Sequence, residues 1–425
     1  NNWALLLDSD GYISEGTGDN FFMIKNNIIY TPEGRNILRG ITREYIFELA
    51  NFSALAFFLL ILYKLDFINN NSLIVWLGLF FSPLIFNYFL FSPYLFGDQF
   101  MYAREVMSLK STGESITNIG LFGRSDTESA VTLTAKMLGL IPLPNYMTVT
   151  SLAFANKLIL FITFLWFKRF FKNENEVLIY FLIPSLILYS SIGLRDTLIV
   201  VISIIFIINL IKGRVLLPIL LLYPLFTLKI QMFVILFLYL LGHLVFQAHR
   251  SRYFFSFFVL IVIVGSFIYE DTILSIINLY RLAFMAEDFV AADGFAGYQA
   301  WGLYGDNESI KLNSIFEVIY TATSNLPVLL LMPMPWNWSN IFYPIQSIES
   351  CLLIYFFLKL SFENKMHKNN EFILLTFILI VGLSIYALIM ANEGTFVRYR
   401  FTLFYPFLLG LFYLARQSHQ DIKSL

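Results

Sequence analysis

Long apolar runs are the feature that most constrains this chain. A helix needs about 20 apolar residues to cross the ~30 Å hydrocarbon core of a bilayer, and runs close to that length recur throughout the second part of the sequence. The runs are 73–95, 147–167, 176–193, 196–211, 230–247, 253–269, 345–361, 371–391 and 401–417, with shorter ones at 53–68 and 214–228. The pattern predicts an all-α multi-pass membrane bundle of about ten transmembrane helices over residues 51–425.

The composition agrees with a lipid environment. Of the 425 residues, 58% are hydrophobic and only 13% are charged, whereas soluble domains carry roughly 25% charged residues. The net charge of -1 leaves no basic face for nucleic acid. The lone cysteine, Cys351, and four dispersed histidines predict no disulfide and no metal site. The lipid bilayer is therefore the expected partner.

Basic clusters between the runs predict the orientation, because cytoplasmic loops are rich in lysine and arginine. The clusters are 168–172, 212–214, 249–252 and 359–368. The opposite face then holds the segments 97–144, 195–196, 270–311 and 392–400, where most acidic residues beyond the N-terminal part collect. We expect a bacterial inner-membrane protein with its active face in the periplasm. The run 312–333 breaks the alternation and is interpreted as re-entrant or interfacial.

Residues 1–50 read differently, as short α/β sequence. The run Trp3–Asp8 and the segments 21–24 and 28–31 favour strands, and Asn26-Asn27 between the last two predicts a hairpin. A helix is expected over 40–50. The chain opens Asn1-Asn2-Trp3, which suggests a truncated reading frame. Two parts are predicted, 1–50 and 51–425.

Three motifs of this N-terminal part are shared with a known family. Glu15-Gly16-Thr17-Gly18-Asp19-Asn20-Phe21-Phe22, Ile29-Tyr30-Thr31 and Leu38-Arg39-Gly40-Ile41-Thr42-Arg43 resemble the class IV pyridoxal-phosphate aminotransferases, with branched-chain amino-acid aminotransferases as the nearest members. The resemblance implies that Glu15 keeps the pyridine nitrogen of the cofactor protonated. It also implies that the Ile41 and Thr42 amides hold the phosphate, and that Gly18 and Leu38 sandwich the ring.

The family's Schiff-base lysine has no counterpart in this segment. In the family it lies well before the glutamate, but none of the residues ahead of Glu15 is a lysine, and Lys25 follows it on a predicted strand. We expect an inactive fragment without its nucleophile. Pyridoxal phosphate is implied by the resemblance alone, and no cofactor is expected for the membrane part.

Asp98 opens the first long external loop. Gly97-Asp98-Gln99-Phe100-Met101-Tyr102 resembles the corresponding loop of GT-C-type glycosyltransferases, which take sugars from polyprenyl-phosphate carriers. The resemblance implies that Asp98 is the general base for the acceptor hydroxyl. Asp98 could equally cap a helix at the membrane surface, where its carboxylate would accept amide hydrogens.

Two further motifs resemble Wzy-like polysaccharide polymerases. Arg195-Asp196 lies at a tight turn between two apolar runs, and Arg398-Tyr399-Arg400 precedes the last run. The resemblance implies that Arg195, Arg398 and Arg400 clamp a polyprenyl phosphate through charge-assisted hydrogen bonds. The alternative is that these residues anchor helix ends to anionic lipid headgroups.

The predicted function is an integral membrane glycosyltransferase or glycan polymerase. Its partners would be a polyprenyl-phosphate-linked sugar and a glycan acceptor, with Asp98, Arg195, Arg398 and Arg400 as the catalytic residues. One alternative is a transporter or flippase of lipid-linked glycans. Another is a branched-chain amino-acid aminotransferase acting through the N-terminus.

Overall fold

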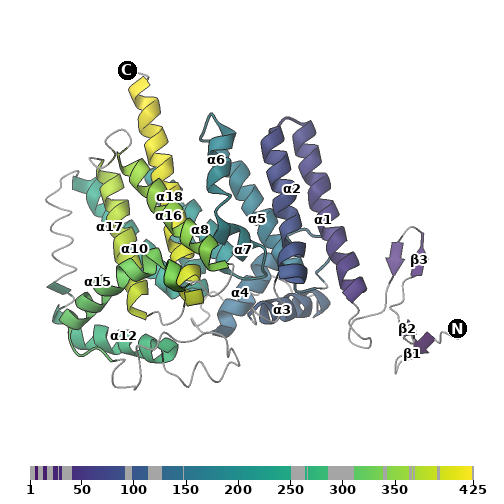
Figure 1. The fold of residues 1–425 in the computed structure, drawn as a ribbon, viewed down its shortest axis with the longest axis horizontal. Coiled ribbons are helices and arrows are strands. Elements are labelled where there is room, and N and C mark those ends of the chain that lie inside the picture. Colours follow the sequence, from purple (N-terminus) through teal and green to yellow (C-terminus); the bar gives the residue numbers. More distant parts are fainter. Residues whose placement is uncertain are drawn as a thin grey trace. The chain divides into compact units, whose positions relative to one another are not determined.

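The computed structural model of the chain is almost entirely helical (Figure 1). It describes residues 5–7, 13–16, 23–26, 28–30, 41–90, 98–112, 127–146, 148–249, 264–265, 267–285, 311–337, 342–362, 366, 369–389 and 393–423. The chain forms two compact units. Unit 1 comprises 1–114, 138–158 and 191–193, and unit 2 comprises 115–137, 159–190 and 194–425.

Two small hairpins open unit 1. Strand β1 (Leu5–Leu7) pairs antiparallel with β2 (Ile13–Gly16), and β3 (Met23–Lys25) pairs with β4 (Ile28–Tyr30). Asn26 has φ 54°, the left-handed conformation that tight hairpin turns require and that asparagine tolerates. The hairpin predicted around this residue is confirmed.

Helix α1 (Ile41–Lys64) joins the two parts that the composition separates. The helix expected at 40–50 and the apolar run 53–68 form one element. It lies beside α2 (Asn70–Leu84), which continues into the π-helical η2 (Ile85–Leu90) (Figure 1). The composition changes near residue 51, but helix α1 continues through that position. The domain boundary at that position stays a prediction.

A polar network lies inside unit 1. Asn51 of α1 is fully buried, and its Nδ2 donates to the Asn145 carbonyl at 3.2 Å and to Ser151 Oγ at 3.3 Å. Asn145 Nδ2 donates in turn to the Phe47 carbonyl at 2.7 Å. Since buried polar groups need partners, these contacts fix α1 against the segment that leads into α5 (Ser151–Lys168).

Most of the remaining helices belong to unit 2. They are α4 (Thr127–Gly139, ending in unit 1), α6 (Glu174–Tyr180), α7 (Pro184–Ser190), α8 (Asp196–Ile211), α9 (Leu216–Leu228), α10 (Ile230–His249), α12 (Glu270–Met285), α15 (Ile315–Leu331), η4 (Pro335–Asn337), α16 (Phe342–Phe362), α17 (Asn370–Ile389) and α18 (Glu393–Lys423). Helix α18 packs along α8, and α17 packs between α15 and α18 (Figure 1).

Five of the described helices are long and apolar enough to cross a membrane. They are Glu44–Lys64, Asn70–Leu90, Ser151–Lys168, Tyr343–Phe362 and Asn370–Leu388, and four shorter apolar helices accompany them. These helices indicate a membrane protein. The all-α membrane part agrees with the prediction, whereas the number of ten crossings remains a prediction.

Two predicted segments differ in the structure. The run 176–193 is a broken helix, α6 followed by α7, because Pro184 lacks an amide hydrogen and starts a new helix rather than continuing the old one. The segment 270–311, expected as a loop, begins with helix α12. Most of the predicted run 253–269 lies outside the described residues.

Candidate functional site: a cation cluster around a buried carboxylate

An ion pair joins the first turn of α8 to the second turn of α18. Asp196 opens α8 and is 1% exposed. Arg398 Nε and Nη2 donate to the same oxygen, Asp196 Oδ2, at 2.9 and 2.8 Å. Charge-assisted hydrogen bonds of this length are strong. The carboxylate therefore fixes the guanidinium of Arg398.

Lys229 lies beside this pair, between α9 and α10. It is buried, and its Nζ lies 3.6 Å from the ring centroid of Tyr399 and 5.4 Å from that of Tyr386. The two rings stack, with centroids 5.3 Å apart. Nζ also donates to Thr402 Oγ1 at 3.3 Å. Burial lowers the pKa of Lys229, against the opposing attraction of Asp196, and the aromatic faces provide a cation–π environment for its charge.

Arg195 completes the group, which we call the cation cluster: Arg195, Asp196, Lys229 and Arg398. Arg195 is the N-cap of α8, makes no side-chain capping hydrogen bond, and interacts electrostatically with Asp196. Three cations thus surround one carboxylate. Excess positive charge at a largely apolar site is unfavourable without an anion, so the arrangement is suited to binding a phosphate.

Arg400 has a different environment from Arg398, although it is only two residues away. It is 1% exposed, and its Nη1 donates to the carbonyls of Leu329, Leu330 and Met332 at 3.2, 3.1 and 2.7 Å. These carbonyls end α15, where a cation complements the helix dipole. The geometry thus gives Arg400 a helix-capping contact, and its predicted role as a phosphate clamp stays a prediction.

Asp98 belongs to unit 1, whereas the cation cluster lies in unit 2. It is the first residue of α3 (Asp98–Thr112), the position at which a carboxylate favours the helix dipole. The neighbouring Gln99 is fully buried, and its Oε1 accepts from the Gly193 amide at 3.4 Å. The two roles expected for Asp98, general base and helix cap, stay predictions.

Of the residues that the aminotransferase resemblance singled out, the structure describes Glu15, Ile41 and Thr42. Glu15 lies in β2 opposite Leu6. Ile41 and Thr42 open α1, while Gly18 and Leu38 lie outside the described residues. Lys25 is the one lysine of residues 1–50 and is exposed at the end of β3. The described hairpins therefore offer one exposed lysine as a nucleophile, and pyridoxal-phosphate binding by the fragment stays a prediction.

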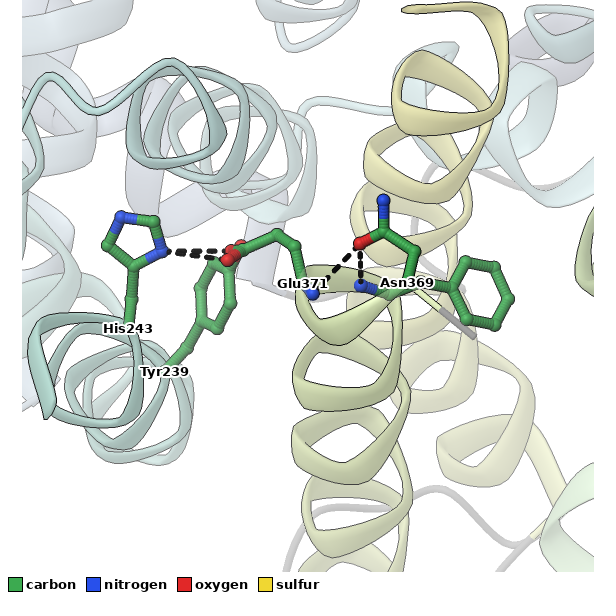
Figure 2. Close-up of polar contacts among 5 residues, drawn as sticks. Tyr239, His243, Asn369 and Glu371 are labelled. Atoms are coloured by element: carbon green, nitrogen blue, oxygen red, sulfur yellow. Dashed lines mark hydrogen bonds and ion pairs between the residues drawn. The ribbon is translucent and has the colours of Figure 1, made fainter. Parts of the chain in front are cut away.

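A polar cluster between α10 and α17 was not among the predicted sites. Tyr239 Oη donates to Glu371 Oε1 at 2.6 Å, and His243 Nδ1 lies 2.9 and 3.1 Å from the two carboxylate oxygens (Figure 2). Tyr239 and His243 are four residues apart, so they share one helix face. The four-residue spacing could have indicated a shared polar face on α10. It could not indicate the partner, because Glu371 lies 128 residues from His243.

Comparison with known proteins concerns the N-terminal part. A family model for amino-transferase class IV matches residues 1–56. A branched-chain-amino-acid aminotransferase of Pseudomonas aeruginosa is 53% identical over 47 residues, 11% of this chain and 15% of that protein. A probable branched-chain-amino-acid aminotransferase of Rickettsia bellii is 53% identical over 47 residues, 11% of this chain and 16% of that protein. The chain thus spans about 15% of the length of these curated relatives.

The first 56 residues are similar to class IV aminotransferases. An Arabidopsis thaliana protein, branched-chain-amino-acid aminotransferase-like protein 1, is also 46% identical over 46 residues, 11% of this chain and 8% of that protein. No solved structure matches the chain. The predicted resemblance of the N-terminal segment is confirmed. The matches give no support to the glycosyltransferase resemblance of the membrane part.

Proposed function

We propose that the membrane part is a glycosyltransferase or glycan polymerase that uses polyprenyl-phosphate-linked sugars. The observation that supports the proposal is the cation cluster, in which three cations face one carboxylate among apolar helices. A sugar leaving a polyprenyl phosphate leaves negative charge on the phosphate oxygens. Prepositioned cations at a site of low polarity stabilise such charge strongly.

Each member of the cluster then has a distinct task. Arg398, fixed by Asp196, donates to the phosphate, and Lys229 and Arg195 add positive charge around it. The bond between the anomeric carbon and the phosphate oxygen breaks, and its electron pair leaves with the phosphate. The acceptor hydroxyl oxygen bonds to that carbon and gives its proton to a base, which we assign to Asp98 on the resemblance alone.

The test is sugar transfer by the purified full chain in nanodiscs that contain a polyprenyl-diphosphate-linked sugar and an unlabelled acceptor glycan. Arg398→Gln should lower turnover at least tenfold, the loss expected when a charge-assisted phosphate contact is removed. Asp98→Asn should lower turnover without weakening carrier binding. Lys311→Gln, which replaces an exposed lysine, is the control. Absence of sugar transfer by the wild-type protein would refute the proposed glycosyltransferase activity.

A transporter of lipid-linked glycans is the second candidate, and the broken helix α6–α7 favours it. Transporters build their substrate sites from interrupted helices. Here Ser185, near the start of α7, donates through its amide and its hydroxyl to Glu349 Oε2, each at 2.8 Å. Movement of labelled carrier across a liposome membrane without sugar transfer would identify this function instead.

A further inference from the structure

A cavity lies at the far ends of α5 and α18. Its volume is about 270 Å³, and it is lined by Arg169, Phe170, Phe171, Lys172, Tyr413 and Gln417. Drug-sized ligands occupy pockets of roughly 300–1,000 Å³. The cavity is therefore large enough for a small polar group but too small for an oligosaccharide. We call it the basic cavity.

In the part of the chain that the structure describes, the acids beside the basic cavity pair with cations that do not line it. Lys168 Nζ pairs with Glu174 Oε2 at 3.0 Å, and Arg416 pairs with Glu176. Both acidic side chains of α6 are thus engaged with cations that do not line the cavity. Among the described residues, no ion pair joins Arg169 or Lys172 to a carboxylate.

A third cation stands against the cavity wall. Lys212 follows the end of α8, and its Nζ lies 3.3 Å from the ring centroid of Phe170 and 5.5 Å from that of Tyr413. Partial burial and the neighbouring Arg214 lower the pKa of Lys212. The rings that line the cavity therefore also hold a cation whose charge is opposed by another cation, and an anion in the cavity would relieve that repulsion.

We propose that the basic cavity binds the phosphodiester of an anionic phospholipid headgroup. It lies at the end of α5, an apolar helix long enough to span a membrane, which is where basic and aromatic side chains meet headgroups. The guanidinium of Arg169 matches two phosphate oxygens, while Lys172 and Lys212 supply point charges. The proposal is independent of glycosyl transfer.

Retention of lipid by the intact protein tests this proposal. The full chain is purified from nanodiscs of phosphatidylcholine alone, or with phosphatidylglycerol added, and the lipids that remain bound are counted by native mass spectrometry. We expect one phosphatidylglycerol to stay bound to the wild type. Arg169→Gln with Lys172→Gln should lower its retention at least tenfold, because two charge-assisted contacts are lost. Lys359→Gln, at an exposed lysine in another predicted cytoplasmic cluster, is the matched control.

Three results would overturn the proposal. Equal retention of phosphatidylglycerol by the double variant would remove the cavity as its site. Displacement of the lipid by millimolar inorganic phosphate, with the same affinity in lipid-free detergent, would assign the cavity to a soluble phosphate. Arg169→Lys with Lys172→Arg preserves both charges, so only a partial loss is expected from the exchanged geometry. A loss as large as that of the double Gln variant would show that the positive charge of the cavity does not hold the lipid.

Discussion

The pair α8–α18 carries a charged group at each end, and the two ends differ in how their charge is held. The helices run in the same direction, because Asp196 meets Arg398 near their starts while Lys212 lies against Tyr413 near their ends. Helix α8 has 16 residues, which corresponds to roughly 24 Å at about 1.5 Å per residue. That distance approaches the ~30 Å of a hydrocarbon core.

At the start of the pair, Asp196 and Lys229 are buried beside stacked tyrosines, while Arg195 and Arg398 are partly exposed. At its end, Arg169 and Lys172 are exposed and Lys212 is partly buried, while the acids of α6 pair with other cations. The same residue types thus have different consequences. A buried charge must have a partner for the protein to fold, while an exposed charge remains available for a ligand.

The largest expected effect is on stability at the buried end. Asp196→Asn should lower the free energy of unfolding by about 3–5 kcal/mol, because the buried Lys229 and the partly exposed Arg398 both lose their carboxylate. Glu176→Gln breaks the partly exposed pair with Arg416 at the other end and should cost about 1 kcal/mol or less. Denaturant unfolding in detergent micelles measures both, and equal losses would show that the two ends do not differ.

The next largest loss in the free energy of unfolding is expected at the contact between α10 and α17. Glu371→Gln weakens the hydrogen bonds of Tyr239 and His243 (Figure 2) and should cost about 1–3 kcal/mol. The same unfolding assay applies, with Tyr239→Phe and the double variant completing a cycle. A coupling energy near zero would mean that Tyr239 and Glu371 act independently, contrary to the structure.

Phosphate binding at the buried end should depend on pH through Lys229. The pKa of Lys229 is lowered in the folded state. As the pH rises, the side chain therefore loses its positive charge before the pH reaches ~10.4, the pKa of a free lysine. The affinity for polyprenyl phosphate should therefore fall about tenfold as the pH rises through the lowered pKa. Lys229→Arg should keep its affinity over the same range, because arginine does not titrate there. A matching fall in both proteins would exclude Lys229 as the cause.

The sign for stability is opposite. The folded state holds the proton of Lys229 less tightly than the unfolded state, so the group destabilises the fold while it is protonated. Raising the pH through its folded-state pKa relieves that penalty. Binding and stability should therefore move in opposite directions over one pH window. The groups near the Lys229 ammonium include the rings of Tyr386 and Tyr399. Its carboxylate partner, Asp196, also interacts with Arg195 and Arg398.

The sequence predicted what depends on local pattern. Apolar runs gave most helices, and the Asn26-Asn27 pair gave a hairpin because the turn needs a left-handed residue. Pro184 was present in a predicted span, but its effect on that span was not anticipated. The ion pair of Asp196 with Arg398 joins residues 202 positions apart. Spacing cannot reveal such a pair, nor can it distinguish Arg398 from Arg400, whose environments are set by different neighbouring helices.

The smallest expected effect is at the exposed end of the pair. Arg214→Gln removes an exposed cation near Lys212 and should change the free energy of unfolding by no more than about 0.5 kcal/mol, as surface substitutions usually do. It should also raise the pKa of Lys212, because a like charge no longer opposes its protonation. Unfolding in lipid-free detergent measures the first effect, and NMR titration of ¹⁵N-labelled lysine measures the second. A stability loss comparable to that of Asp196→Asn would mean that the cations at this end also support the fold, and the contrast between the two ends would fail.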